Sequence, residues 1–455
     1  MMTNTNIRLF GGQDCGEMIF KLQDAMANNK TVSSLEIRET ALDDDMIDSV
    51  VSLLSRGSVE TIHLEDCSAH LNKSVVRLVE ALGNCEDVRL SEFTFLSRFF
   101  FETFLGSATK LKSLRIRDHL FVEQIVALSR GLAINRILHT LDLSYSRIDD
   151  FSILAEGLKG CCAKRLGLRS IGLRDDHLGL LMAALDSSAG AVAQKLESLD
   201  LSFNRLRNPS CIGDFLRSPD CHLRELLIGY QNLWQADYNG KNVDVTKIAQ
   251  SLAVNTSLRT LGLRQNELGD TDALELATAL EENFTLETLD LGENNVSDPG
   301  VLALANTARS SSRGLQRLNL RRNQFGTKAS LALLEAASTN FRLLTIDSTD
   351  ERRGRNIQDE RIHRQIRYHT ALNRGGRELL LWTEGPPPQA LWPLVLAKQA
   401  PWPRRDETNG GNNRADCSSK RTSGLDDMRI DVLYYLLKES PTTFFLSQKH
   451  VTLGC

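Results

Sequence analysis

Hydrophobic and polar residues alternate in the same order at several places along the chain. The stretches LRTLGLRQNELGD (258–270), LETLDLGENNVSD (286–298) and LQRLNLRRNQFGT (315–327) follow one pattern. Each contains alternating apolar residues, as in a strand with one buried face. A stretch of helical period follows the first of them, in which we expect Leu274, Ala277 and Leu280 to share a buried face. Each unit is therefore predicted to be a strand, a turn and a helix.

Twelve such units can be counted over residues 32–349, aligned on the apolar residue at the centre of each predicted strand. These central residues are expected to be Leu35, Ile62, Val88, Leu114, Leu141, Ile171, Leu199, Leu226, Leu261, Leu289, Leu318 and Leu344. Ile7 and Leu9 lie about one interval earlier, and they predict an N-terminal capping repeat over residues 1–31. Only the interval between Leu226 and Leu261 stands out, because it is 35 residues long.

A single unit cannot bury its own apolar stripe, so neighbouring units must stack, with parallel strands on one side and helices on the other. Neighbouring strands lie about 4.8 Å apart and packed helices about 8–10 Å apart. The stack must therefore curve with its strands inside. The predicted fold is an α/β solenoid in the shape of a horseshoe, with a parallel sheet on the concave face, helices on the convex face and a mainly helical C-terminal tail.

Asparagine recurs where the predicted strands end, at Asn204, Asn266, Asn294 and Asn323. At this point the chain turns inward and leaves backbone groups that a buried amide can bond on both sides. We therefore assign these four residues a structural role in the turn. The same position is held elsewhere by small or polar residues that can partly replace the amide, and once by Phe93, which cannot. The polar substitutes are Cys67, His119, Ser146, Asp176 and Gln231.

The repeats resemble the ribonuclease-inhibitor-like class of leucine-rich repeat proteins over residues 7–349. The resemblance implies the fold more than a function, because the class includes inhibitors, immune-receptor sensor regions, GTPase-activating proteins and scaffolds. The motifs N-R-x-G-R (373–377), W-P-x-V-L (392–396) and YYLLKESPTTF (434–444) resemble the tail of uncharacterised algal leucine-rich repeat proteins. That resemblance implies an interaction protein and brings no known activity.

The pattern changes after the last repeat. Residues 350–403 contain eight arginines between 352 and 377, where an amphipathic helix is predicted, and then a Trp/Pro-rich segment. We expect the apolar segment from Trp382 to Leu396 to cap the last repeat, since a solenoid end needs a cover. Residues 404–424 are polar and rich in Gly, Ser and Asn, which predicts a disordered linker, and residues 425–455 are predicted to form a C-terminal helix and tail.

Composition and motifs favour a binding protein over an enzyme. The net charge of −4 favours no nucleic-acid partner, and no signal peptide or membrane span is recognisable, so we expect a cytoplasmic or nuclear monomer. The nine cysteines show no paired spacing, which argues against a disulfide framework or a zinc site. No nucleotide-binding, metalloprotease or serine-hydrolase motif occurs. The expected protein therefore has no catalytic residues, metal or cofactor.

The concave face is the predicted binding surface, because the residues beside each central residue point away from the core. The fourth residue after each central residue forms what we call the edge row. Its candidate binding residues are Glu39, Asp66, Glu92, Asp118, Tyr145, Asp175, Phe203 and Tyr230, joined by Trp234 from the long interval. Inner rows add the arginines Arg115, Arg117, Arg174, Arg264 and Arg321. We expect acidic residues to steer a protein partner with a basic patch toward the aromatic centre.

Two other functions stay open at this point. The chain could be a GTPase-activating protein in which Arg117 or Arg174 stabilises phosphoryl-transfer charge. The acidic tail of that family is missing, however, because residues 351–455 carry a net charge of +5. It could also be a ubiquitin-ligase adaptor that docks through LWP (391–393) and YYLL (434–437), although no F-box-like segment is recognisable at the N-terminus.

Overall fold

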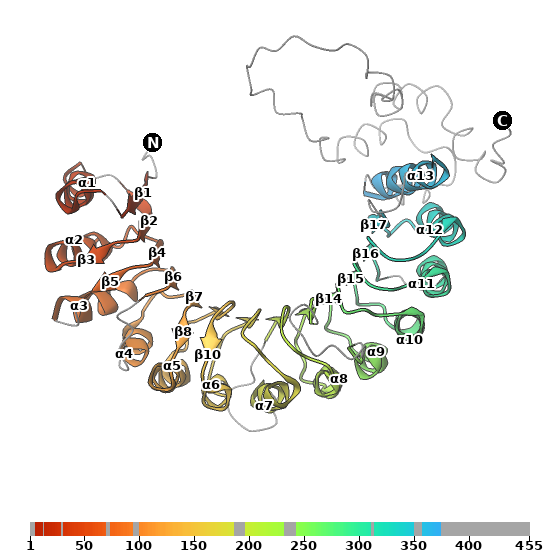
Figure 1. Ribbon diagram of the computed structural model, residues 1–455, viewed down its shortest axis with the longest axis horizontal. Coiled ribbons are helices and arrows are strands. Elements are labelled where there is room, and N and C mark those ends of the chain that lie inside the picture. The colour runs from red at the N-terminus through yellow and green to blue at the C-terminus, as the bar shows by residue number, and fades with distance from the viewer. Residues whose placement is uncertain are drawn as a thin grey trace, which may run out of the picture.

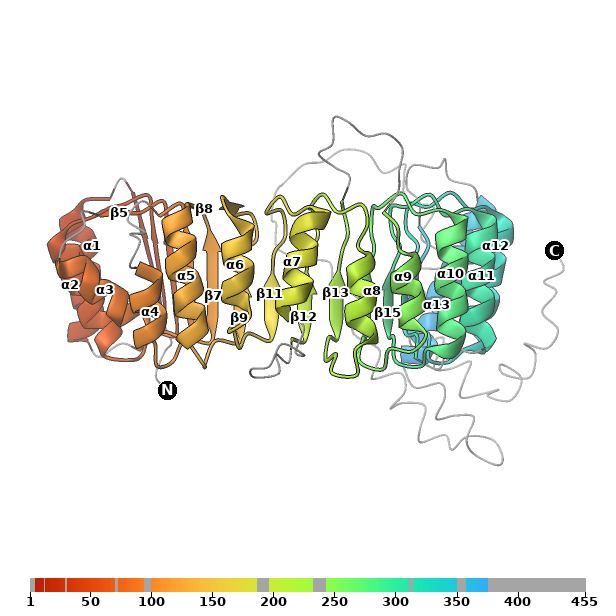
Figure 2. The same ribbon diagram turned by 90° about the horizontal axis from the view of Figure 1, so that it is seen from below.

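A computed structural model describes residues 5–11, 13–28, 31–69, 73–93, 100–185, 196–231, 243–310, 314–349 and 357–374. Within these ranges the chain forms a curved solenoid with strands on the inner face and helices on the outer face (Figure 1). Seen from below, the helices lie side by side across the convex face (Figure 2). None of the described helices is long and apolar enough to cross a membrane.

Strands and helices alternate along the described chain. The main sheet has thirteen described parallel strands: β1 (Thr5–Phe10), β2 (Val32–Arg38), β4 (Thr61–Glu65), β6 (Asp87–Ser91), β7 (Ser113–Arg117), β9 (Thr140–Asp142), β11 (Arg165–Gly167), β12 (Ser198–Asp200), β13 (Glu225–Leu227), β14 (Thr260–Gly262), β15 (Thr288–Asp290), β16 (Arg317–Asn319) and β17 (Thr345–Asp347). Two short pairs lie outside it, β3 (Ala41–Leu42) with β5 (Ser68–Ala69), and β8 (His119–Leu120) with β10 (Arg147–Ile148). The helices are α1 (Cys15–Ala27), α2 (Asp44–Ser55), α3 (Lys73–Leu82), α4 (Phe100–Ser107), α5 (Val122–Ile134), α6 (Phe151–Leu158), α7 (Asp175–Leu185), α8 (Ser210–Arg217), α9 (Thr246–Leu252), α10 (Asp270–Glu282), α11 (Asp298–Ser310), α12 (Thr327–Thr339) and α13 (Ile357–Arg374).

The strand register identifies the central residue of each repeat. The residues that pair from strand to strand are Leu35, Ile62, Val88, Leu114, Leu141, Leu166, Leu199, Leu226, Leu261, Leu289, Leu318 and Ile346. Two of the predicted central residues were therefore wrong. Leu166 takes the place predicted for Ile171, and Ile346 takes the place predicted for Leu344.

The error in the sixth repeat has a simple cause. The segment RLGLRSIGLR (165–174) contains two alternating apolar pairs, and either could form the strand. The sheet uses Leu166, which pairs with both Leu141 and Leu199, while the backbone amide of Ile171 donates to Oδ1 of Asn204 at 3.1 Å in the turn. The intervals around Leu166 are then 25 and 33 residues, so the chain has a second long interval that the sequence count missed.

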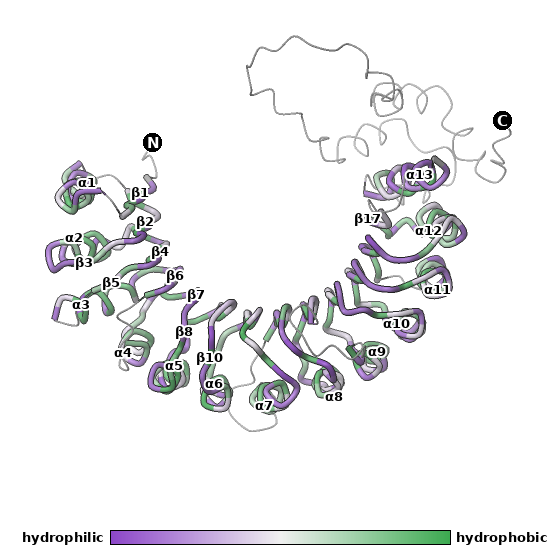
Figure 3. Tube along the Cα trace, in the orientation of Figure 1, coloured by the Kyte–Doolittle hydropathy of each residue, from purple (hydrophilic) through white to green (hydrophobic). Residues whose placement is uncertain are grey.

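The hydrophobic core lies between the sheet and the helices. Central strand residues and those two positions later are buried, as Leu289 and Leu291 are. Figure 3 shows that hydrophobic and hydrophilic residues alternate within both layers. On α10 the buried face contains Ala273 and Leu276, at the spacing of one helical face, whereas Leu274 is 56% exposed. The prediction that Leu274 faces the core was wrong.

Helix α13 covers the far end of the last repeat (Figure 1). Its residues Ile362, Ile366 and Leu372 are buried, and the helix packs against α12 and β17. The basic segment therefore uses its apolar face as a cover. The predicted cap from Trp382 to Leu396 lies outside the described residues, as do the predicted linker 404–424 and the tail 425–455.

Candidate partner-binding surface

A row of buried amides holds the chain where each strand turns away from the sheet. The side-chain amide of Asn294 donates to the carbonyls of Leu263 at 3.0 Å and Leu291 at 2.9 Å. Its Oδ1 accepts from the backbone amides of Asn266 at 2.9 Å and Leu268 at 3.1 Å. Asn204, Asn266 and Asn323 make corresponding contacts. Gln231 also does so, because its amide reaches the carbonyls of Leu201 and Ile228.

The edge row has a special backbone conformation. Ten described edge-row residues adopt a left-handed φ: Glu39, Asp66, Glu92, Tyr145, Ser170, Phe203, Tyr230, Gln265, Glu293 and Arg322. This region is costly for residues with a large side chain. Backbone hydrogen bonds to the next repeat hold this conformation, such as Tyr145 N to Arg169 O at 2.7 Å and Tyr230 N to Arg264 O at 2.7 Å. The row is therefore fixed by the sheet and presents its side chains at one edge of the concave face.

The first repeats present an acidic end of the edge row. Glu39, Asp66 and Glu92 are exposed, and their carboxylates form no ion pair with any residue that the structure describes. Asp118 differs, because its two oxygens accept from the backbone amides of Phe93 at 2.9 Å and His119 at 2.7 Å. Burial raises the pKa of Asp118, although these hydrogen bonds oppose the rise. Asp118 thus has a turn contact that the sequence analysis did not foresee, next to the position where Phe93 replaces the asparagine.

Two predicted residues of the concave face lie elsewhere. With Leu166 as the central residue, the edge-row position is Ser170, and Asp175 is instead the first residue of α7. Its carboxylate accepts from the backbone amides of Arg207 and Asn208, at 2.9 and 3.0 Å. Arg174 precedes this helix, and its place in the inner row belongs to Arg169.

Arginines and aromatic rings contact one another across the middle of the concave face. We call this set the arginine–aromatic ladder: Arg117, Tyr145, Arg169, Phe203, Tyr230 and Arg264. The guanidinium carbon of Arg169 lies 4.1 Å from the centre of the Phe203 ring and 5.7 Å from that of Tyr145. Phe203 and Tyr230 stack with their centres 4.2 Å apart. The ladder joins six repeats, and its residue Tyr145 is 50% exposed.

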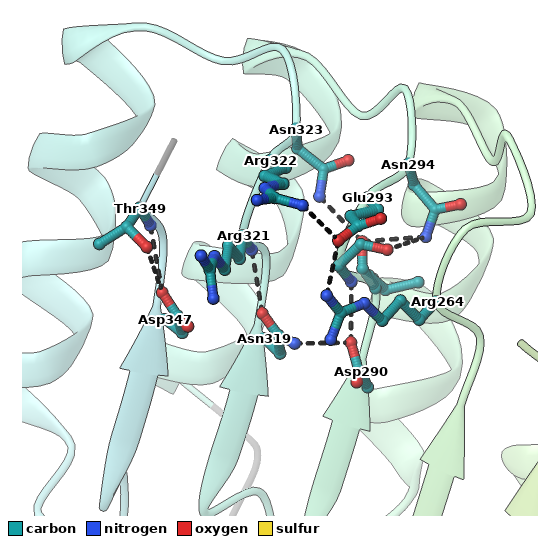
Figure 4. A network of polar contacts seen from close by, with 12 residues as sticks. Arg264, Asp290, Glu293, Asn294, Asn319, Arg321, Arg322, Asn323, Asp347 and Thr349 are labelled. Atoms are coloured by element: carbon teal, nitrogen blue, oxygen red, sulfur yellow. Dashed lines mark hydrogen bonds and ion pairs between the residues drawn. The ribbon is translucent and has the colours of Figure 1, made fainter. Parts of the chain in front are cut away.

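The ladder continues into an ionic network in the last repeats (Figure 4). At one end of the ladder the guanidinium carbon of Arg117 lies 5.5 Å from the centre of the Tyr145 ring. At the other end the guanidinium carbon of Arg264 lies 5.8 Å from the centre of the Tyr230 ring. Arg264 also donates to Oε1 of Glu293 at 2.6 Å, and Arg322 donates to the same oxygen at 3.0 Å.

The environment of the ionic network shifts the pKa values of two carboxyl groups, Glu293 and Asp290. Burial acts to raise the pKa of Glu293, but the hydrogen bonds and charges of Arg264 and Arg322 outweigh it and lower that pKa. Nearby, burial raises the pKa of Asp290, which accepts from the Asn319 amide at 2.8 Å. Glu293 is therefore a carboxylate held between two guanidinium groups.

The described residues offer little for covalent or metal chemistry. Burial raises the pKa of the Cys85 and Cys161 thiols to about 12, so neither forms a thiolate near neutral pH. No group of three or more possible metal ligands occurs among the described residues. Trp234 and the rest of the segment 232–242 lie outside the described residues.

Comparison with known families agrees with this geometry. A family model described as Leucine Rich repeat matches residues 254–277 and 282–305, and a Leucine Rich Repeat model matches residues 195–215. The fold is a leucine-rich repeat solenoid. The matched strand–turn–helix segments belong to the same stacked sheet and helix layer described above.

Several curated proteins and solved structures are similar to parts of this leucine-rich repeat chain. It is 35% identical over 146 residues to NACHT, LRR and PYD domains-containing protein 3 of Mus musculus, covering 31% of this chain and 13% of the relative. Protein 5 of the same name and organism is 25% identical over 248 residues, covering 53% and 16%. The chain therefore spans less than a fifth of these relatives. A Leptospira interrogans LRR protein has 14% identity and a TM-score of 0.41, covering 80% of this chain and 98% of that one.

Proposed function

We propose that this leucine-rich repeat chain is a non-catalytic scaffold that binds a protein partner in its concave face. The observation that carries the proposal is the arginine–aromatic ladder, with Tyr145, Phe203 and Tyr230 at its centre. Tyrosine and arginine are enriched among the residues that dominate the energy of protein interfaces. Here tyrosine and arginine side chains lie together on one surface. An ordinary polar residue would be enough at most exposed positions of a strand.

The ladder is also well organised for binding before a partner arrives. Its side chains project from the ends of adjacent strands of one parallel sheet, and the rings and guanidinium groups already stack on one another. Binding would therefore immobilise few free side chains, each of which costs about 0.5–1.5 kcal/mol when it is ordered. Preorganisation of this kind favours affinity.

The acidic end gives the surface a direction. Glu39, Asp66 and Glu92 lie in the repeats before the ladder, with no described ion-pair partner. Exposed charge pairs contribute about 0–1 kcal/mol to affinity and act mainly on the association rate. We therefore assign these residues to steering a basic part of the partner, and assign the rings to holding it.

The two alternative functions gain no support from a particular contact. Arg117, one of the arginines considered for GTPase activation, stacks on Tyr145, and Arg174 lies at the start of a helix. The segments 391–393 and 434–437 considered for ligase docking lie outside the described residues. The scaffold proposal uses only the described surface.

Affinity capture from the native cell tests the proposal. The bait is the chain ending at Arg374, which keeps the cover helix α13, beside the same chain carrying Tyr145→Ala and Tyr230→Ala. We expect the bait to retain a partner that the double variant loses. A partner retained equally by both would contradict the concave-face proposal. Recovery of a small GTPase or of ligase subunits, especially by the full chain alone, would favour one of the alternatives.

A further inference from the structure

The arginines of the concave face divide into neutralised and unneutralised groups. Three of those nearer the ends form ion pairs: Arg38 with Glu65 at 3.0 Å, Arg89 with Asp87 at 2.8 Å, and Arg264 with Glu293 at 2.6 Å. In the middle, Arg115, Arg117 and Arg169 form no ion pair with any described residue. Arg115 is paired in register with Asp142, but a carboxylate oxygen of Asp142 accepts the Ser144 backbone amide at 3.0 Å.

Arg169 and Arg264 occupy equivalent positions, each three residues after the central residue of its strand. Each guanidinium lies near the ring of the preceding edge-row residue, which is Tyr145 for Arg169 and Tyr230 for Arg264. At the following edge-row position Arg264 meets the carboxylate of Glu293, whereas Arg169 meets the ring of Phe203. The positive charge of Arg169 is therefore held in place without an internal carboxylate.

We propose that Arg169, supported by Arg115 and Arg117, binds a carboxylate of an acidic segment in the protein partner. This inference rests on the concave-face function proposed above and names the chemistry that the partner must bring there. A guanidinium fixed on aromatic faces keeps its N–H edge available for a two-pronged bond to an oxyanion. Glu293, bound by Arg264 and Arg322, shows that a carboxylate suits this place on the sheet.

The surface then requires a partner with charges in a defined order. The acidic end finishes at Glu92, after strand β6, and Arg169 follows strand β11, with β7 and β9 between. Three steps of about 4.8 Å separate the two positions by roughly 14 Å. An extended chain crosses that distance in about four or five residues. A basic group and an acidic group at that spacing would meet both sites at once.

Titration with fluorescently labelled polyglutamate tests the carboxylate site without the natural partner. We expect Arg169→Gln in the full chain to weaken polyglutamate binding at least about fivefold at low salt. Arg89→Gln is the control, because it removes the same charge from a residue of the concave face that lies outside the ladder and that Asp87 already neutralises at 2.8 Å; it should change binding less than about twofold. Equal effects of the two variants would overturn the proposal, since binding would then follow total charge. Circular dichroism checks that both variants are folded.

A gain-of-binding variant provides a second test. Glu293→Gln leaves Arg264 and Arg322 without their shared carboxylate, and we expect it to strengthen polyglutamate binding at least about threefold. No gain would contradict the assignment of stacked arginines as carboxylate sites.

Competition with glutarate and inorganic phosphate distinguishes the oxyanion. Glutarate should displace polyglutamate from the unmodified chain at least as well as phosphate does, and a clear preference for phosphate would overturn the carboxylate assignment. These outcomes are separate from the scaffold proposal. If Arg169→Gln had no effect while Tyr145→Ala still weakened capture of the partner, the concave face would remain the binding surface and only its carboxylate site would be lost.

Discussion

At the scale of single residues, buried amides decide where each strand ends. The strand-end asparagines satisfy backbone groups on two neighbouring repeats, as Asn294 does with five hydrogen bonds. A second set lies at the ends of helices, where Asn255 and Asn283 bind backbone of the preceding repeat. The sequence analysis did not recognise this second set, although Asn255 and Asn283 each lie six positions before the central residue of the following strand, Leu261 or Leu289.

Replacement of Asn294 measures the strand-end contribution. Asn294→Ala leaves buried carbonyls and amides without partners, at about 1–3 kcal/mol for each unsatisfied group. We expect a loss of about 3 kcal/mol or more in unfolding free energy, measured by urea denaturation. The neighbouring residue Asn295 is exposed, and its side-chain oxygen accepts from the side-chain amide of Gln324 at 3.0 Å. Its backbone bond to Leu268 does not need the side chain, so Asn295→Ala should cost less than about 0.5 kcal/mol. Similar costs for the two would show that the buried amide has no special role.

At the scale of elements, the cover helix α13 shows how the solenoid ends. Its Asn373 side-chain amide donates to the carbonyls of Asn340 at 3.0 Å and Leu343 at 2.9 Å. In the same way, the side-chain amide of Asn283 donates to the carbonyl of Asn255 in the preceding repeat at 2.9 Å. Helix α13 therefore docks as the helix of a further repeat would, and its buried apolar residues complete the core.

Two truncations distinguish the contribution of α13 to stability from that of the segment that follows it. Ending the chain at Thr349 removes three buried apolar side chains, Ile362, Ile366 and Leu372, each contributing about 1.5–3 kcal/mol. We expect a lower midpoint of thermal unfolding and protease cleavage near α12. Ending it at Arg374 should preserve both properties. If the second truncation lowered the unfolding midpoint as much as the first, the result would favour the cap predicted for Trp382 to Leu396.

The docking of α13 is also expected to depend on pH. His363 Nδ1 lies 2.9 Å from the Ser348 hydroxyl, and burial lowers the pKa of His363 below its ordinary value of 6.5. Arg367 acts in the same direction, whereas Asp359 and Asp347 oppose it. The unfolded chain therefore takes up this proton at a higher pH than the folded chain does. Stability from neutral His363 is present above about pH 6.5 and declines as pH falls below it.

Hydrogen exchange of α13 at pH 7.5 and pH 5.5 measures this effect, after correction for the intrinsic exchange rates. Protection in the unmodified chain should fall at the lower pH. His363→Gln removes the titrating group and should reduce the dependence in α13, while α10 serves as an internal reference. An unchanged dependence in the variant would assign the effect to other groups.

At the scale of the whole molecule, curvature brings distant residues into one surface. The ladder runs from Arg117 to Arg264, and its contacts join side chains that are 24 to 34 residues apart in the sequence. Acidic, aromatic and paired ionic regions then follow one another along the sheet. The chemistry of the surface therefore changes from one end of the sheet to the other, although all the repeats have the same fold.

Kinetics with the partner can distinguish steering from holding. Tyr145→Ala or Tyr230→Ala should weaken affinity about 30-fold, mainly through faster dissociation, because a central aromatic contributes about 2 kcal/mol. Asp66→Lys should chiefly slow association and flatten its salt dependence. Surface plasmon resonance at two salt concentrations measures both rates. Unchanged affinity in both aromatic variants would show that the partner does not bind at the centre of the concave face.

The sequence by itself determined the architecture and most of the edge row. Alternating apolar residues, a following helical period and a regular interval leave stacking as the only way to bury each unit, so the parallel sheet and outer helices were predictable. Tyr145, Phe203 and Tyr230 could be placed in one row from spacing alone. Tertiary structure decided the rest, because Leu166 and Ile171 satisfy the same local pattern and only pairing with Leu141 and Leu199 selects Leu166. That selection brings Arg169 between two aromatic rings, a contact that depends on how neighbouring strands align and cannot be read from either repeat alone.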